Sequence, residues 1–221
     1  MSRPKFIFDL DGTLYRYKGG PTFATSEFYA EIKRNIFRFL EQEIQIPTQH
    51  VMETYDCLKQ TWDGHVSLGV EKEYGVDRRR YFASTWDVSP EKYIEPNDDA
   101  RAVLSVLQGR CAVLTEAPRV WAESALRFLN VYEFVKDALF TGEPDIRKPS
   151  VGAFEMVGTT LGVPFDSIFS VGDQEESDII LAHRAGMRAI RVGGKNTEAD
   201  FSVSNVREIL TLAAFDTRRT H

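Results

Sequence analysis

The sequence predicts an α/β protein with a doubly wound parallel sheet and one inserted helical domain. Four short apolar runs are interleaved with segments of helical periodicity, as is typical of a parallel sheet with helices on both faces. The stretch from about residue 17 to 93 shows helical patterns without a clear strand. A chain of 221 residues is long enough for one sizeable domain and a smaller module. We expect an α/β core from residues 1–15 and 96–221, and a helical domain from 16–95.

The strands are predicted from four runs that are apolar throughout. A strand that is buried on both faces of a parallel sheet needs a continuous apolar run rather than an alternating one. The four runs are Phe6–Phe8, Cys111–Leu114, Ile168–Val171 and Ala189–Val192.

Helices are predicted between and after these strands from apolar spacing and end signals. Proline suits a first helical turn, and glycine commonly follows a last one. A serine, threonine or asparagine with Glu three residues later is typical of a helix start. One predicted helix follows Pro118, and a second follows Lys148-Pro149 with Gly162 as its C-cap. A third runs from about Glu175 to Ala185, and a last one begins near Asn205 with Glu208 in this spacing.

The helical stretch interrupts the alternation directly after the first strand. Its first helix shows one apolar face, formed by Phe28, Ile32, Phe39 and Leu40. Open α/β sheets bind ligands at the carboxyl ends of their strands, which is where this insertion leaves the sheet. We therefore expect the helical domain to act as a lid.

Composition and charge exclude several classes of protein. The net charge of −6 gives no indication of nucleic acid or of an anionic membrane as a partner. Cys57 and Cys111 are far apart, without metal-ligand spacing, and fit a reducing compartment. No signal-peptide core or membrane-spanning run is present in the sequence, so a cytoplasmic location is expected. The sequence defines no oligomeric state.

The first predicted strand runs directly into two carboxylates, Asp9 and Asp11. An unpaired charge at the end of a buried strand is costly, so a cation or a phosphate-handling site is expected to neutralise them. Gly12 allows the backbone to turn sharply or to approach a ligand closely. A polar turn is the alternative, because Asp and Gly are ordinary turn residues.

Further polar residues follow the other strands at the same edge of the sheet. Thr115 ends the second strand, and its hydroxyl can hold a phosphate oxygen. Lys148 precedes a helix and can offset phosphate charge. Asp173 follows the third strand, and Asp178 lies five residues beyond. Each has an ordinary alternative: a strand-end threonine, a surface lysine, or acidic residues at a helix N-terminus.

The order of these signals resembles that of the haloacid dehalogenase-like hydrolase superfamily. That superfamily shows strand-Asp-x-Asp-Gly-Thr, strand-Thr, Lys-Pro and strand-Gly-Asp-x4-Asp in the same order. The resemblance covers Lys5 to Leu14 and the chain from about Pro96 onward. It implies a Rossmann-like core with a helical cap between the first two motifs. Phosphoglycolate phosphatases and pyrimidine 5′-nucleotidases belong to this subfamily.

The resemblance implies a Mg²⁺-dependent phosphatase acting on a small phosphorylated metabolite. Asp9 would attack the phosphoryl group and become an aspartyl phosphate, and Asp11 would act as general acid and base. Thr115 and Lys148 would bind the phosphoryl group. Mg²⁺ would be held by Asp9, the backbone carbonyl of Asp11, and Asp173, with Asp178 behind them or as a further ligand.

Glu116 departs from the family, whose members often carry Asn at this position. If its side chain lines the substrate site, its carboxylate would repel anionic groups. If the position contributes only a backbone amide, the change matters little.

Other readings of the same sequence stay open. A haloacid dehalogenase would use Asp9 against carbon, without metal or second acid, and a sugar-phosphate mutase would return the phosphoryl group to sugar. A receiver domain or an idle phospho-ligand binder is a non-enzymatic alternative, although receivers lack a large helical insertion. Substrate-reading residues in the insertion are sought among Arg16, Tyr17, Lys18, Trp62, His65 and Arg78 to Arg80, for which solvent exposure or packing is the ordinary role.

Overall fold

The computed structural model describes residues 3–20, 22–194 and 198–212, which form two compact units. One contains the described residues of Met1–Arg16 and Ile94–His221, and the other is Tyr17–Tyr93. The predicted domains also include residues 1–2, 21, 195–197 and 213–221, which lie outside the described residues. Over the described ranges, no helix has the length and apolarity needed to cross a membrane.

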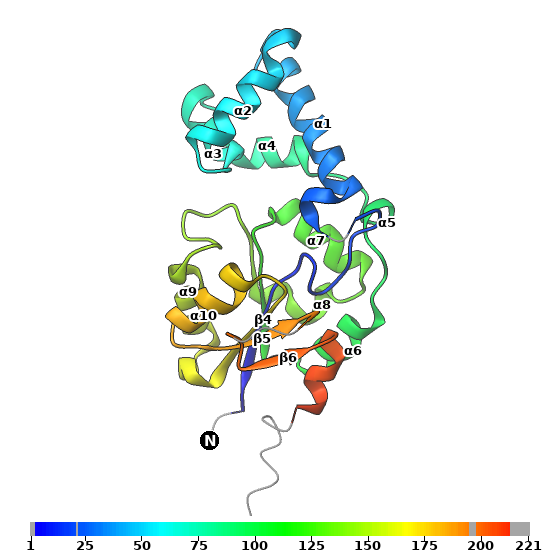
Figure 1. Ribbon diagram of the computed structural model, residues 1–221, viewed down its shortest axis with the longest axis vertical. Coiled ribbons are helices and arrows are strands. Elements are labelled where there is room, and N and C mark those ends of the chain that lie inside the picture. Colours follow the sequence, from blue (N-terminus) through cyan, green and yellow to red (C-terminus); the bar gives the residue numbers. More distant parts are fainter. Residues whose placement is uncertain (1–2, 21, 195–197, 213–221) are drawn as a thin grey trace, which may run out of the picture. The chain divides into compact units, whose positions relative to one another are not determined.

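The first unit contains a parallel sheet (Figure 1). It has six strands, in the order β3-β2-β1-β4-β5-β6. The chain builds the sheet outward from β1 in one direction and then from β4 in the other, which confirms the predicted doubly wound α/β class. The strands are β1 (Lys5–Phe8), β2 (Cys111–Leu114), β3 (Leu139–Phe140), β4 (Ile168–Gly172), β5 (Arg188–Val192) and β6 (Phe201–Val203).

All four predicted strands are present, within one residue of their predicted ends. The two strands that the sequence did not predict, β3 and β6, lie at the two edges of the sheet. The central strands are almost wholly buried, which explains why their sequences are apolar without interruption.

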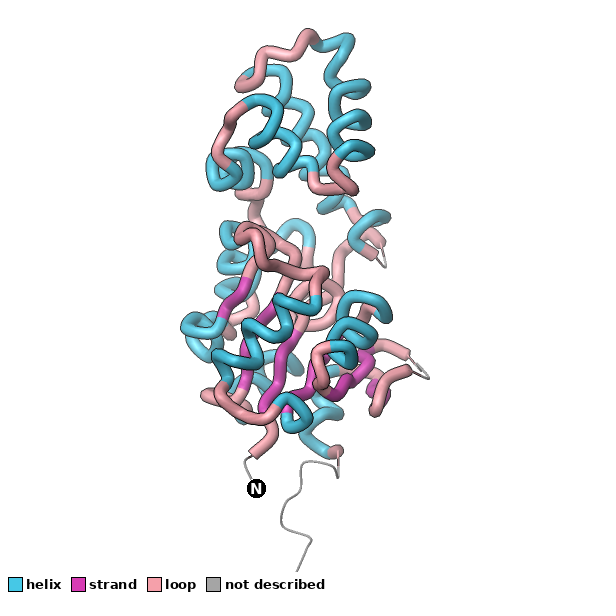
Figure 2. Tube along the Cα trace, turned by 90° about the vertical axis from the view of Figure 1, so that its left-hand side faces the viewer, coloured by secondary structure: helices cyan, strands magenta, loops and turns pink. Residues whose placement is uncertain are grey.

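Helices cover both faces of the sheet, as Figures 1 and 2 show. On one face, α9 and α10 pack over Ile7, Ala112 and Ile168 of the sheet in one buried cluster. On the other face, α8 contacts β2 and packs against both α6 and α7. The helices of this unit are α6 (Asp98–Val106), α7 (Arg119–Phe128), α8 (Tyr132–Val135), η3 (Lys136–Ala138), α9 (Val151–Leu161), η4 (Phe165–Ser167), η5 (Glu175–Ile180), α10 (Leu181–Arg184) and η6 (Val206–Thr211).

Two predicted helices differ in type from an α-helix. The helix predicted from Glu175 to Ala185 begins as a π-helix, η5, and only then continues as α10. π-helical turns are rare in proteins, and those that do occur are often found at functional sites. The last predicted helix is a 3₁₀ helix, η6, which is capped by Asn205 and by Glu208, whose Oε2 accepts a hydrogen bond from Ser204 N at 3.1 Å.

The second unit is built from helices and loops, and every described strand belongs to the first unit (Figure 2). Its longest helix, α1, starts at Ser26, whose side chain accepts a hydrogen bond from Tyr29 N. The predicted apolar face of α1 is buried. The helices of the second unit are η1 (Phe23–Thr25), α1 (Glu27–Gln42), η2 (Thr48–His50), α2 (Val51–Thr61), α3 (Val66–Tyr74), α4 (Arg78–Thr85) and α5 (Pro90–Tyr93).

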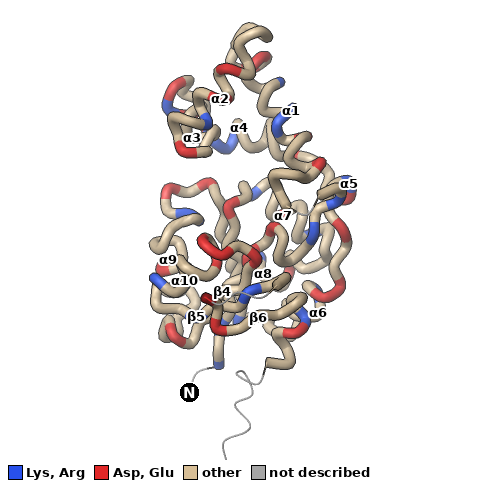
Figure 3. The backbone as a smooth tube through the Cα atoms, viewed as in Figure 1, with Lys and Arg blue, Asp and Glu red and all other residues tan. Residues whose placement is uncertain are grey.

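Acidic and basic residues are interspersed along both units (Figure 3).

Candidate active site

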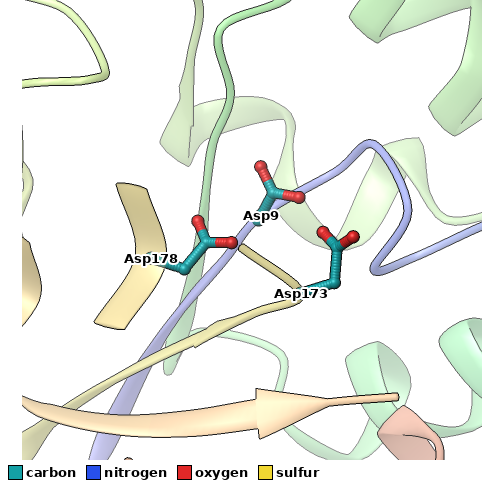
Figure 4. Close-up of side chains that lie close together, drawn as sticks. All are labelled: Asp9, Asp173 and Asp178. Atoms are coloured by element: carbon teal, nitrogen blue, oxygen red, sulfur yellow. The ribbon is translucent and has the colours of Figure 1, made fainter. Parts of the chain in front are cut away.

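The carboxyl ends of β1 and β4 bring three carboxylates together (Figure 4). Asp9 follows β1, and its backbone N–H still donates to Val171 O at 2.9 Å, as in the sheet. Asp173 follows β4, and Asp178 comes from the π-helix η5. Each offers one oxygen, and these three oxygens lie within 4.8 Å of one another.

Two glycines make this close approach possible. Gly12 has a φ of +87°, and a Cβ there would lie 2.7 Å from Asp173 Oδ2. Gly172 ends β4, and a Cβ at this position would overlap the carboxyl carbon of Asp178. Both glycines are therefore required by sterics where the carboxylates pack against the strand ends.

Lys148 is the ammonium group that pairs with two of these carboxylates. Its Nζ donates to Asp9 Oδ1 at 2.7 Å and to Asp178 Oδ1, and its side chain is only 2 % exposed. Burial acts to lower the pKa of Lys148, but the Asp178 and Asp9 carboxylates outweigh burial and raise it well above its ordinary value. Lys148 is therefore a fixed positive charge between two acids.

Asp9 is the least satisfied carboxylate of the group. Its Oδ2 is buried and has no hydrogen-bond partner among the described residues. Burial raises the pKa of Asp9 well above its ordinary value; Lys148 opposes this rise, and the neighbouring carboxylates add to it. An unpaired buried oxygen that accepts from no donor is suited to binding a cation or an electrophile.

Asp173 and Asp178 differ in their surroundings. Asp178 is 1 % exposed, and both of its oxygens accept hydrogen bonds. Oδ1 accepts from Lys148 Nζ, and Oδ2 accepts from Gln174 N at 2.8 Å. Asp173 is partly exposed and accepts a hydrogen bond from Thr13 Oγ1 at 3.2 Å. Burial, followed by the charge of Asp178, raises the pKa of Asp173. Asp173 therefore has more capacity left for a cation.

Asp11 turns toward a different set of donors. Its Oδ1 accepts from the Tyr15 hydroxyl and lies 3.3 Å from Trp121 Nε1. Its Oδ2 accepts from Thr115 Oγ1 at 3.0 Å. The Thr115 hydroxyl in turn accepts from Ala117 N at 3.0 Å, so Thr115 links Asp11 to the turn after β2.

Glu116 is solvent-exposed but stands beside this cluster. The surrounding protein raises the pKa of Glu116 by desolvation; the charge of Lys148 opposes this, while Asp178 and Asp11 add to it. The loop that leads to Lys148 packs tightly on its backbone, because a Cβ at Gly142 would overlap the carbonyl oxygen of Glu116.

The structure brings together six of the predicted site residues through direct contacts or shared proximity: Asp9, Asp11, Thr115, Lys148, Asp173 and Asp178. The sequence did not identify two partners of Asp11, Tyr15 and Trp121. For Tyr15, the only sequence signal was its position close to Asp11 at the end of the first motif. For Trp121, which lies on the buried face of α7, the only signal was its helical spacing.

Several residues proposed to read substrate in the helical unit have packing roles there. Tyr17 is buried and stacks on Phe28 with ring centroids 6.0 Å apart. Trp62 Nε1 donates to Glu73 Oε1 at 2.7 Å. Arg78 is buried, with its guanidinium over the Phe82 ring. These contacts lie within the unit and define no ligand by themselves.

Comparison with known proteins agrees with this arrangement. Residues 6–186 match the family model described as haloacid dehalogenase-like hydrolase. A glyceraldehyde 3-phosphate phosphatase from Methanopyrus kandleri is 25% identical, over 92% of this chain and 94% of its own length.

Two solved structures share the fold over nearly the whole chain. A 2-haloacid dehalogenase from Pseudomonas syringae superposes with a TM-score of 0.63 at 19% identity, covering 96% of this chain and 99% of its own. A phosphatase of the same superfamily from Thermococcus onnurineus gives a TM-score of 0.59 at 16% identity, covering 94% of this chain and 96% of its own. At these identities the likeness concerns the fold alone.

Proposed function

The chain belongs to the haloacid dehalogenase-like hydrolases, and from this premise we propose that it is a Mg²⁺-dependent phosphatase of small phosphomonoesters. The proposal depends chiefly on the environment of Asp9. One of its oxygens accepts a hydrogen bond from Lys148, and the other is buried with no donor in the part of the chain that the structure describes. Two more carboxylates lie beside it. This arrangement suits a carboxylate nucleophile whose free oxygen is directed at phosphorus.

The donor set fits Mg²⁺, which prefers hard oxygen ligands. Asp9 and Asp173 would be direct ligands together with the backbone carbonyl of Asp11. Asp178 would be a further ligand or would hold the site through Lys148, since both of its oxygens already accept hydrogen bonds. When bound, Mg²⁺ would offset the repulsion between these carboxylates and favour the ionised nucleophile.

The first step is proposed to form an aspartyl phosphate. A carboxylate oxygen of Asp9 attacks phosphorus, the ester P–O bond breaks, and the leaving oxygen takes a proton from Asp11. Lys148 and Thr115 would hold the phosphoryl oxygens. In the second step, Asp11 takes a proton from water, the water oxygen attacks phosphorus, and Asp9 is released with inorganic phosphate.

A dehalogenase is the second candidate, because a 2-haloacid dehalogenase shares the fold. In a dehalogenase, Asp9 would attack carbon and the chain would need neither a cation nor a second acid. The group of Asp9, Asp173 and Asp178, together with Asp11 bonded to Thr115, favours the phosphatase. A sugar-phosphate mutase would use the same first step and differ only in the acceptor.

The substrate is proposed to be a small soluble phosphate ester. The Methanopyrus relative is named for glyceraldehyde 3-phosphate, so triose phosphates are the first compounds to test. Phosphoglycolate and nucleoside 5′-monophosphates extend the panel to the compounds acted on by the resembled subfamily.

The test measures phosphate release by the purified full chain from this panel and from p-nitrophenyl phosphate. We expect release that EDTA abolishes and added Mg²⁺ restores. Asp9→Asn should remove activity, and Asp11→Asn should accumulate an acyl phosphate detectable by mass. Asp137→Asn is the matched control, because it makes the same chemical change at an exposed carboxylate in η3.

Three outcomes would contradict the proposal. Full activity of the Asp9→Asn variant would remove the nucleophile assignment. Chloride release from 2-chloropropionate without phosphate release would favour the dehalogenase. Conversion of glucose 1-phosphate to glucose 6-phosphate without net phosphate release would favour the mutase.

A further inference from the structure

Tyr15 and Trp121 form a buried donor chain that ends on one oxygen of Asp11. We propose that they are positioning residues which hold Asp11 Oδ1 in the interior, so that Oδ2 is the oxygen that exchanges the proton. This inference rests on the proposed function, in which Asp11 is the acid and base. The inference adds which oxygen of Asp11 exchanges the proton and which side chains orient the carboxylate.

The direction of the hydrogen bonds follows from the chemistry of the two side chains. Trp121 Nε1 lies 2.9 Å from the Tyr15 hydroxyl oxygen, and an indole N–H can only donate. The Tyr15 oxygen therefore accepts from Trp121, and its own single proton is directed to Asp11 Oδ1. Chained donors of this kind polarise one another, so the two bonds reinforce the hold on Oδ1.

Burial makes this orientation rigid. Tyr15 and Trp121 are both 0 % exposed, and their rings meet edge to face with centroids 6.3 Å apart. They come from separate segments, the loop after β1 and the helix α7. The loop is further held by Leu14, whose N–H donates to Leu10 O at 3.0 Å and whose carbonyl accepts from Asn97 Nδ2 at 2.8 Å.

The other oxygen of Asp11 faces the proposed phosphoryl site. The Thr115 hydroxyl accepts a hydrogen bond from Ala117 N, and its own single proton is directed to Asp11 Oδ2. Before substrate binds, the three donors therefore fix the rotation of the carboxylate, with Oδ1 held from the interior and Oδ2 held by Thr115. When a phosphoryl group binds, the Thr115 proton would turn from Asp11 Oδ2 to a phosphoryl oxygen, which would leave Oδ2 as the oxygen that exchanges a proton with the substrate.

Loss of this orientation should affect substrates according to how much their leaving oxygen needs a proton. General acid catalysis contributes on the order of 10²–10⁴-fold, and more for a basic leaving group. p-Nitrophenolate leaves with little help, whereas the more basic phenolate of phenyl phosphate needs protonation. A misoriented Asp11 should therefore penalise phenyl phosphate more than p-nitrophenyl phosphate.

The experiment compares kcat/KM for these two aryl phosphates in Tyr15→Phe and Trp121→Phe proteins with Mg²⁺ present. Tyr15→Phe removes one donor and keeps the ring, whereas Trp121→Phe removes the other donor and replaces the indole with a smaller aromatic ring. Trp121→Phe provides a second variant if Tyr15→Phe folds poorly. We expect the phenyl phosphate value to fall about tenfold more than the p-nitrophenyl value. KM for p-nitrophenyl phosphate should stay near that of the wild type.

Tyr55→Phe is the matched control. It removes a hydroxyl that lies 3.0 Å from the Tyr29 hydroxyl in the helical unit, and it should leave the ratio of the two kcat/KM values unchanged. Equal losses on both substrates in the Tyr15 and Trp121 variants, in protein that melts as a folded chain, would overturn the positioning role.

Asp11→Asn separates this inference from the function on which it rests. It should change the substrate ratio in the same direction as the Tyr15 and Trp121 variants, and by more. If Asp11→Asn leaves the ratio unchanged, the acid role itself fails. If Asp11→Asn changes the ratio and neither donor variant does, only the positioning inference fails.

Discussion

Replacing Lys148 by methionine tests the buried charges of the site most directly. Methionine has a similar length and no charge, so Lys148→Met removes the ammonium and leaves Asp9 and Asp178 in place. Both carboxylates are buried, at 6 % and 1 % exposure, and cannot be solvated without opening the site. The variant therefore isolates the electrostatic contribution of Lys148 to folding.

The expected loss follows from the geometry. At the 2.7 Å that separates Lys148 Nζ from Asp9 Oδ1, the Coulomb attraction at an effective dielectric constant of 20 is about 6 kcal/mol before desolvation. Removing one partner of a buried pair typically costs about 3–5 kcal/mol net. We expect a reduction of that size in the free energy of unfolding at neutral pH without Mg²⁺, which is a large share of the roughly 5–15 kcal/mol of a typical domain.

The pH dependence provides an independent check of the sign. Lys148 lowers the pKa of Asp9, so its removal raises that pKa further above the unfolded value. A carboxyl with a raised folded pKa destabilises the protein above its unfolded pKa and stops doing so when both states are protonated. The cost of Lys148→Met should therefore be present at neutral pH, grow as the pH rises toward the folded pKa of Asp9, and shrink as the pH falls toward the unfolded pKa of about 4.

Urea unfolding followed by tryptophan fluorescence at several pH values measures this cost. The double variant Lys148→Met/Asp178→Asn is the matched control, because it removes one of the two stranded carboxylates and should be more stable than Lys148→Met alone. A cost below about 1 kcal/mol at pH 7, or one that does not shrink in acid, would refute the reasoning.

Three further predictions concern other residues of the site. Burial and the charge of Asp178 raise the pKa of Asp173, so Asp173→Asn should raise the melting temperature in EDTA by a few degrees, and it should weaken the Mg²⁺-induced rise in thermal-shift assays. Gly172→Ala should lower the free energy of unfolding by about 2 kcal/mol or more in chemical denaturation, because the added Cβ would overlap Asp178. Gly152→Ala is the control and should lower it little, because the added Cβ would make only an ordinary contact. If the Glu116 side chain lines the substrate site, Glu116→Gln should increase kcat/KM for phosphoglycolate several-fold relative to p-nitrophenyl phosphate, because it would remove a negative charge near the substrate's carboxylate. An unchanged ratio would favour the alternative, in which the position contributes only its backbone.

The central strands of the sheet could be predicted because burial on both faces demands an apolar run. The edge strands could not be predicted. β3 consists of Leu139–Phe140 and β6 of Phe201–Val203, and both are too short to show a pattern. Each pairs with a single neighbour, so sheet position rather than local sequence decides that these segments are extended.

The acidic residues of the site could be predicted for a related reason. Parallel strands bring their carboxyl ends to one edge, so a carboxylate after each of two strands implies proximity. The π-helical turn that positions Asp178 could not be predicted, because acidic residues after a strand fit an ordinary helix start equally well. The same limit applies to Tyr15 and Trp121, whose polar atoms meet Asp11 only through the fold.

The distribution of donors explains how Asp9, Asp11, Asp173 and Asp178 coexist at this sheet edge around the Lys148 ammonium. Asp178 has Lys148 and a backbone N–H, Asp11 has three side-chain donors, and Asp173 has a threonine hydroxyl and partial exposure to water. Asp9 shares Lys148 but keeps one buried oxygen without a donor among the described residues. A fold selected only for stability would pair this oxygen, since leaving it unpaired is costly. The unpaired position is therefore best explained as the point where a cation or a phosphoryl group completes the site.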